Sequence, residues 1–249
     1  MDPRTVQYYD DNAEEIFALY EGSKSGPEKY FKLAFPPGAE ILDIGAGSGR
    51  DMGILMREAY EAYGAEPSPR LRALATERIH GLAGRIYAGS LPGLAAVINR
   101  KFDGILCAAV FQHIPQEQQF DAAFDIRNLL KPNGRLLLSF PKDRPGIDAS
   151  CRDDRGRLYT PLISAAIELL FERLGFQRIG KWETADRRPA RSPSRLRGTQ
   201  RPPCHSAARR APSSCARSPG MARRAPPELN KGISSAIAEF LSAFFSPAK

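Results

Sequence analysis

The stretch that decides the fold reads Glu40-Ile41-Leu42-Asp43-Ile44-Gly45-Ala46-Gly47-Ser48-Gly49-Arg50-Asp51. It begins as a short apolar strand, turns on three glycines at alternate positions and continues as a helical pattern to Tyr60. A strand, a glycine turn and a helix place backbone N–H groups and a helix N-terminus at the carboxyl end of a strand. Open α/β sheets bind their ligands at such a point, so the stretch predicts a cofactor site.

The spacing of the glycines separates two kinds of cofactor. A dinucleotide fingerprint, G-x-G-x-x-G, would need a glycine at position 50, where Arg50 stands. The pattern here is D-x-G-x-G-x-G, with Asp43 closing the strand. It resembles the first motif of class I S-adenosylmethionine-dependent methyltransferases. The resemblance implies that the glycines let the backbone pass close to the methionine half of the cofactor, and that Asp43 helps to hold its charged amino-acid end.

An acidic residue follows the glycine turn at the end of the next predicted strand. The segment 62–66 is predicted to be the second strand and ends in Glu66, nineteen positions after Gly47, with Pro67 terminating the strand. A carboxylate at this place is expected to accept hydrogen bonds from the two ribose hydroxyls of a nucleoside cofactor. The alternative is an exposed glutamate at a strand end.

Further strands are predicted over 85–89, 102–110, 135–140 and 176–183, with helices between them. This alternation indicates an α/β fold with a doubly wound, mostly parallel Rossmann-like sheet and helices on both faces. The phrase from Asn128 to Leu138 resembles the helix, turn and fifth strand of the same methyltransferases. The resemblance covers residues 1–183.

The resemblance implies a cofactor site assembled from the ends of neighbouring strands. Its predicted members are Asp43, Gly45, Ala46, Gly47, Gly49, Glu66, Pro67, Ser90, Leu91 and Ala108. Ser90 stands where the family usually has an acid that meets the adenine amino group, and Leu91 is expected to pack on the ring. Ala108 and its small neighbours are expected to line the methionine side.

Two further features bear on the acceptor. An aromatic helix over 4–20 is predicted to cover the cofactor, or simply to pack on the sheet edge. His113 is the candidate general base, because its pKa is near working pH, but it could equally cap the next helix or face solvent. Methyl transfer from a sulfonium needs mainly positioning and an attacking lone pair, so no base is obligatory.

The basic charge is confined to one segment. Eleven of the 36 basic and one of the 28 acidic residues lie in 186–227, so this segment carries +10 and the rest of the chain −2. Residues 184–227 are rich in Arg, Pro and Ser and are predicted to be disordered. One hypothesis is that this segment is the product of a shifted reading frame in the gene. The seventh strand that the family sheet needs is therefore predicted to be missing, and 228–249 is predicted to be an amphipathic helix.

The cysteines and the lengths of the apolar runs allow expectations about disulfides, metal sites and location. The four cysteines, Cys107, Cys151, Cys204 and Cys215, form no C-x-x-C pair, and neither a disulfide framework nor a metal site is expected. No apolar run is long enough for a membrane span, and no secretory signal is recognisable, so a cytoplasmic location is expected.

The sequence is compatible with three functions. The leading hypothesis is methyl transfer from S-adenosyl-L-methionine to an oxygen, nitrogen or carbon nucleophile of a small molecule. The second is an NAD(P)-dependent oxidoreductase, which fits Glu66 but not Arg50. The third is a non-enzymatic protein that binds nucleic acid through the arginine-rich segment 184–227. The acceptor and the oligomeric state are left open.

Overall fold

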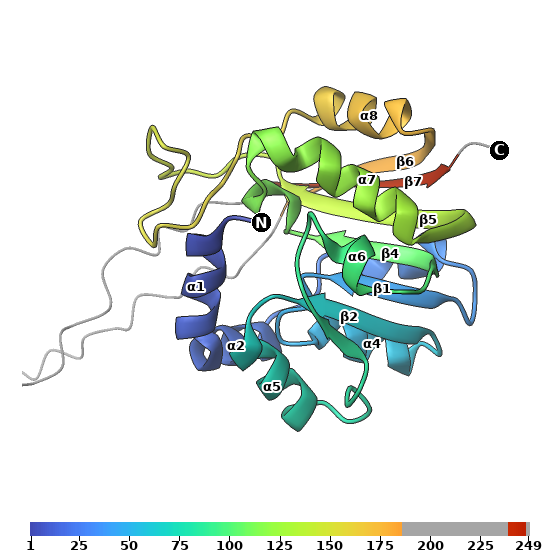
Figure 1. The fold of residues 1–249 in the computed structure, drawn as a ribbon, viewed down its shortest axis with the longest axis horizontal. Coiled ribbons are helices and arrows are strands. Elements are labelled where there is room, and N and C mark those ends of the chain that lie inside the picture. Colours follow the sequence, from blue (N-terminus) through green and yellow to red (C-terminus); the bar gives the residue numbers. More distant parts are fainter. Residues whose placement is uncertain (186–238, 248–249) are drawn as a thin grey trace, which may run out of the picture. The chain divides into compact units, whose positions relative to one another are not determined.

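The computed structural model describes residues 1–185 and 239–247. Within these residues seven strands form one sheet in the order β3-β2-β1-β4-β5-β7-β6 (Figure 1). The strands are β1 (Glu40–Ile44), β2 (Glu61–Glu66), β3 (Ile86–Ala88), β4 (Phe102–Ala108), β5 (Leu130–Pro141), β6 (Phe176–Ala185) and β7 (Glu239–Pro247). The first five pair in parallel, and β7 is antiparallel to both β5 and β6. The predicted doubly wound α/β fold is confirmed.

Helices cover both faces of this sheet. They are α1 (Pro3–Asp11), α2 (Ala13–Glu21), α3 (Phe31–Ala34), α4 (Arg50–Arg57), α5 (Pro69–Arg78), α6 (Leu94–Val97), α7 (Gln119–Leu129) and α8 (Ser164–Arg173). Short 3₁₀ turns span Glu28–Tyr30, Phe111–His113 and Gln116–Gln118. Figure 1 shows α6, α7 and α8 on the near face and α4 behind the sheet, with α1 standing at the edge where β1 and β4 end.

The two faces of the sheet hold separate hydrophobic clusters, because alternate side chains of a strand point to opposite sides. In β1, Leu42 and Ile44 belong to the cluster under α7 and α8, whereas Ile41 belongs to the cluster under α3 and α4. In β4, Ile105 and Leu106 divide in the same way, and both are completely buried. Parallel strands buried on both faces require continuous apolar runs, which the sequence of β4 has.

Two helix boundaries differ from the sequence-based expectations. The single helix predicted over 4–20 is broken at Asn12, whose backbone leaves the helical region and whose side-chain amide donates to the Tyr8 carbonyl. The sequence also favours a helix with Thr160 as its N-cap and Pro161 at its first position, but this helix begins at Ser164. Thr160 cannot cap it, because its hydroxyl donates to the Ile114 carbonyl at 3.0 Å.

The prediction that the seventh strand is missing is wrong. β7 lies between β5 and β6 and is supplied by residues that follow the arginine-rich segment. The prediction of a helix over 228–249 is wrong for 239–247, which form this strand. A short apolar run cannot be distinguished from a buried helix by periodicity alone. Thr184 also belongs to β6, so the segment begins later than predicted.

Aromatic packing holds the last two strands to α8. Phe245 of β7 is completely buried and stacks on Phe171 of α8 at a centroid distance of 5.1 Å. Phe176 of β6 meets the same Phe171 ring edge-on at 5.3 Å. These residues therefore share one core with the rest of the domain.

The expectations for residues 186–238 lie outside the described residues. Neither the disorder predicted for the arginine-rich segment nor its use in nucleic-acid binding is tested by the structure. In the part of the chain that is described, no helix is long and apolar enough to cross a membrane.

The register of the last two strands predicts that residues 186–238 are dispensable for the fold. Ala185 and Glu239 are direct partners in the antiparallel pair, so a two-residue Asn-Gly turn can close the hairpin in place of 186–238. We expect this variant to keep its melting temperature to within a few degrees, as measured by circular dichroism. A matched Phe245→Ala substitution should lower the free energy of unfolding by about 3–5 kcal/mol. A shortened chain that does not fold would contradict the prediction.

Candidate active site

The glycine turn lies between β1 and α4, at the carboxyl edge of the sheet, and is fixed to β2. The N–H groups of Gly45 and Ala46 both donate to the Ala65 carbonyl, at 2.8 and 3.1 Å. Gly45, Gly47 and Gly49 have positive φ angles of 72°, 55° and 76°. A Cβ atom on Gly45 would lie 2.3 Å from Cγ2 of Val110, so only glycine fits this close approach.

Glu66 closes the turn from the end of β2. Its Oε2 accepts the Gly47 N–H at 2.9 Å and its Oε1 accepts the Ser68 N–H at 2.9 Å. The side chain is buried, and this burial raises its pKa. The alternative of an exposed strand-end glutamate is therefore wrong. Each carboxylate oxygen can accept a second hydrogen bond, so the group can still receive ligand hydroxyls.

Asp43 lies at the end of β1 beneath the turn and is almost completely buried. Burial raises its pKa well above its usual range, and the neighbouring Asp51 carboxylate raises it further, against the opposing effect of Arg50. Arg50 donates to Asp51 at 2.9 Å. A buried carboxyl near a second acid favours a cation beside it, and the ammonium group of an amino acid would meet that need.

The other predicted cofactor residues follow the neighbouring strands. Ser90 and Leu91 come after β3 and Ala108 ends β4, so all three lie on the side of the sheet where the glycine turn lies. Ser90 and Ala108 are half-buried. Leu91 is completely buried within the cluster under α7, and its carbonyl accepts the amino group of Met1. Their contacts with adenine and methionine remain predictions.

His113 is a buried, fully paired side chain in the turn after β4. Its Nδ1 lies 2.5 Å from the Leu158 carbonyl and must donate to it, which leaves Nε2 to accept from the Gln112 amide at 3.3 Å. Burial lowers its pKa to about 4, so the ring is neutral at pH 7. Since both ring nitrogens are engaged within the protein, this geometry favours the structural interpretation over the general base.

The sequence analysis missed a cluster of tyrosines and arginines that adjoins the glycine turn. The tyrosine–arginine cluster consists of Tyr8, Tyr9, Tyr20, Arg144, Asp153, Arg155, Arg157 and Tyr159. Its centre is Arg157, which donates to the Tyr9 hydroxyl at 3.1 Å and lies 5.4 Å from the Tyr159 ring centroid. A Cβ atom on Gly47 would lie 3.5 Å from the Tyr20 ring, so the cluster begins directly above the turn.

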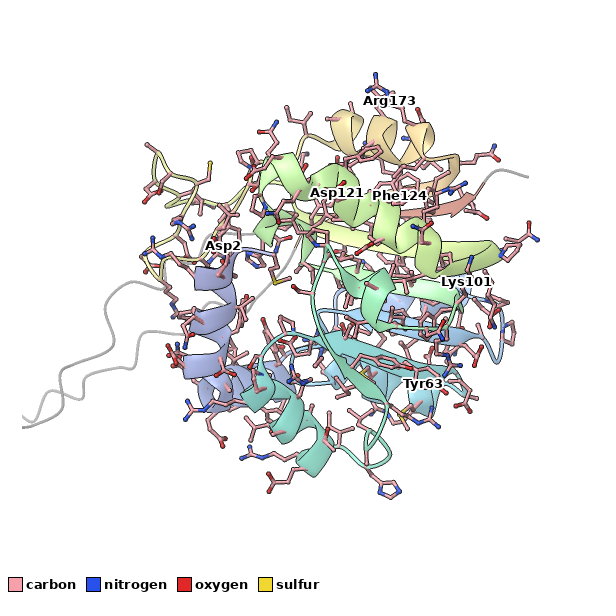
Figure 2. The ribbon with its side chains drawn as sticks, in the orientation of Figure 1. Asp2, Tyr63, Lys101, Asp121, Phe124 and Arg173 are labelled. Atoms are coloured by element: carbon pink, nitrogen blue, oxygen red, sulfur yellow. The ribbon has the colours of Figure 1, made fainter. Side chains whose placement is uncertain are left out.

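Hydrogen bonds hold the N-terminal helix α1 over the carboxyl edge of the sheet. Asp2 caps α1 and forms two hydrogen bonds with the Arg152 guanidinium, at 2.8 and 2.9 Å (Figure 2 shows Asp2 at the start of α1). The hydrogen bond from Arg152 lowers the pKa of Asp2 to about 2. The Leu158 N–H donates to Thr5 at 2.8 Å. These contacts support the prediction that the N-terminal aromatic helix covers the site.

Two buried polar atoms near the predicted cofactor residues have no protein partner. They are Oγ of Ser48, in the glycine turn, and Oε1 of Gln112, in the turn after β4. Buried polar groups nearly always have a partner, so a bound molecule is the natural candidate. With the acceptor capacity of Glu66 and the buried acid Asp43, the residues present fit a nucleoside that carries an amino acid. No group of three or more possible metal ligands occurs among the described residues.

Fold and site together define a Rossmann-like enzyme domain that binds a nucleoside cofactor. A methyltransferase-domain family matches residues 23–179, more than half of the chain, and the chain belongs to this family. The predicted methyltransferase family is thereby confirmed.

Known relatives cover the chain only in part. An uncharacterised methyltransferase of Geobacillus kaustophilus is 26% identical over 55% of this chain and 60% of its own length. A ubiquinone biosynthesis O-methyltransferase of Xanthomonas oryzae is 31% identical over 41% of this chain and 43% of its own. The chain thus spans about two fifths to three fifths of these curated relatives.

Solved structures of the same fold match almost the whole chain. One is the 1,6-didemethyltoxoflavin-N1-methyltransferase of Burkholderia thailandensis with bound 1,6-didemethyltoxoflavin and S-adenosylhomocysteine. It has a TM-score of 0.61 and 16% identity, and the match covers 98% of this chain and 88% of that chain. At this identity the likeness shows the fold.

The environment of His113 predicts a dependence of stability on pH. Because its pKa is about 4 in the folded protein and about 6.5 when unfolded, the unfolded chain binds more protons between these values. The contribution is fully present above pH 6.5 and is lost as the pH falls toward 4, by roughly 3 kcal/mol. Urea unfolding at several pH values measures it.

A folded His113→Asn variant provides the control for this loss. We expect its stability to change less between pH 6.5 and 4.5 than that of the wild type. Equal slopes for the two proteins would contradict the low pKa.

Proposed function

We propose that this methyltransferase transfers the methyl group of S-adenosylmethionine to a nucleophilic oxygen, nitrogen or carbon of a small molecule. The observation that carries the proposal is the buried Glu66 carboxylate, hydrogen-bonded to the Gly47 N–H at the carboxyl edge of the sheet. Two similar proteins support a small acceptor, since one is a ubiquinone biosynthesis O-methyltransferase and the other is solved with bound 1,6-didemethyltoxoflavin.

Each predicted residue has a definite task in this proposal. Glu66 accepts hydrogen bonds from the ribose hydroxyls, and Asp43 faces the amino group of the methionine half. Gly45 and Gly47 leave room for the cofactor against the backbone. The cofactor, when bound, supplies an electrophilic methyl group on a sulfonium centre.

The protein's own contribution to the transfer is positioning and exclusion of water. The hydrogen bonds that Asp2 accepts from Arg152 and that Thr5 accepts from the Leu158 N–H hold α1 over the carboxyl edge of the sheet. The Tyr20 ring lies against Gly47 of the glycine turn, and the Tyr20 hydroxyl is hydrogen-bonded with Tyr9. The proposal needs no side-chain base, in keeping with the paired state of His113.

The two rival functions have less support. An NAD(P)-dependent oxidoreductase is disfavoured because the chain belongs to a methyltransferase family and has Arg50 in place of the third glycine. Nucleic-acid binding rests on residues 186–227, which lie outside the described part of the chain, and it remains a prediction.

Calorimetric titration with S-adenosylhomocysteine tests the proposal. We expect the wild type to bind, and Glu66→Gln to bind about 30-fold more weakly, because hydrogen bonds to a charged group contribute about 2 kcal/mol. Glu117→Gln is the matched control, since Glu117 is exposed at the start of the helical segment before α7.

Two outcomes would contradict different parts of the proposal. A folded wild type that does not bind S-adenosylhomocysteine ends the proposed function. Unchanged affinity in a folded Glu66→Gln variant removes the ribose assignment alone. Circular dichroism of each variant checks that the fold is retained.

A further inference from the structure

We propose that the tyrosine–arginine cluster is the acceptor-binding site and that it selects a small aromatic molecule carrying a negative charge, such as a carboxylate. This inference rests on the proposed function and assigns a substrate class to it. It concerns Arg144 above all, a residue that no step of the methyl transfer itself requires.

The cluster forms a continuous series of contacts that starts at the cofactor turn. The Tyr20 ring lies against Gly47, and its hydroxyl is hydrogen-bonded with Tyr9. Tyr9 accepts from Arg157, which in turn lies over the Tyr159 ring. The Arg144 guanidinium lies 4.8 Å from the centroid of the same ring and is partly exposed. A molecule bound along this series would extend from solvent toward the glycine turn.

The tyrosine–arginine cluster holds more positive guanidinium groups than negative carboxylates. Asp153 is buried, and its Oδ2 accepts from Arg157 at 2.7 and 3.0 Å. Its Oδ1 is used by the backbone N–H groups of Arg155 and Arg157. Arg144 approaches the same carboxylate only at 3.6 Å. The three guanidinium groups of the cluster, those of Arg144, Arg155 and Arg157, therefore have one carboxylate between them. Arg155 donates to the neutral Tyr8 hydroxyl. Positive charge is left over in the cluster, part of it at Arg144.

Two nearby acids, Asp2 and Asp148, have other hydrogen-bond partners. Asp2 is engaged by Arg152, and Asp148 accepts hydrogen bonds from Ser150 and the Arg152 N–H. His113 is neutral because burial lowers its pKa. An anionic group is thus the ligand that the partly exposed guanidinium fits best.

The walls of the cluster suit a flat ring. The His113 ring lies edge-on to Tyr159 at 4.8 Å and to Tyr9 at 6.0 Å. Aromatic side chains that meet at such distances and angles offer faces and edges for a further ring. An aromatic acid would use the rings for stacking and Arg144 for its carboxylate.

The test uses the full chain saturated with S-adenosylhomocysteine. The probes are the three hydroxybenzoates and the three matching hydroxybenzamides, which differ in charge but hardly in shape. Affinities are measured by ligand-detected NMR titration. We expect at least one acid to bind about tenfold more tightly than its amide, the effect of one charge-assisted hydrogen bond.

Substitutions show which residue causes the preference for the acid over the amide. Arg144→Gln should remove the difference between acid and amide, and Arg144→Lys should restore part of it. Arg173→Gln should leave it unchanged, because Arg173 is exposed at the end of α8 and points away from the site (Figure 2).

The results separate this inference from the proposed function. A wild type that binds S-adenosylhomocysteine but binds none of the six probes, or binds acids and amides equally, overturns the acceptor class. A preference that persists in folded Arg144→Gln overturns the assignment to this residue. Failure of the wild type to bind S-adenosylhomocysteine overturns the proposed function itself.

Discussion

The close packing of the glycine turn against Val110 is the constraint on which the site depends. Gly45 approaches that side chain so closely that one methyl group would not fit, and its N–H is fixed to the Ala65 carbonyl. This turn therefore joins β1, β2 and the end of β4 in one rigid unit. Glu66 can reach the Gly47 N–H only because of that geometry. A buried carboxylate is costly unless it is hydrogen-bonded, so the turn also stabilises the acid that we assign to the ribose.

The parts of this arrangement that depend on neighbouring residues could be predicted from the sequence. The glycine spacing, the acid at Glu66 and the apolar strands are short-range patterns, and the fold that they predict is the one observed. The tyrosine–arginine cluster was not predictable in the same way. Arg157 and Tyr9 are 148 positions apart, and nothing in either local sequence specifies their hydrogen bond. The pairing of His113 with Leu158 was missed for the same reason.

The order of the last two strands bears on the hypothesis of a shifted reading frame. β7 pairs with β6 from Phe176 to Ala185, and Phe245 packs into the core beneath α8. Random residues would rarely place apolar side chains so that they fit between two existing strands. The segment 239–247 therefore belongs to the same fold as 1–185. The hypothesis of a shifted frame over 184–227 stays a prediction.

The N-terminal helix connects the two ligand sites that we propose. On the cofactor side, Asp10 accepts hydrogen bonds from the Ser68 hydroxyl at 2.7 Å and from the Arg70 N–H, and the Ser68 N–H in turn binds Glu66. On the acceptor side, Tyr9 of the same helix accepts from Arg157. Because one helix contributes to both sets of contacts, it cannot leave one site without disturbing the other. A ligand that stabilises the contacts of α1 at one site would therefore also stabilise its contacts at the other, so the two ligands would favour each other's binding.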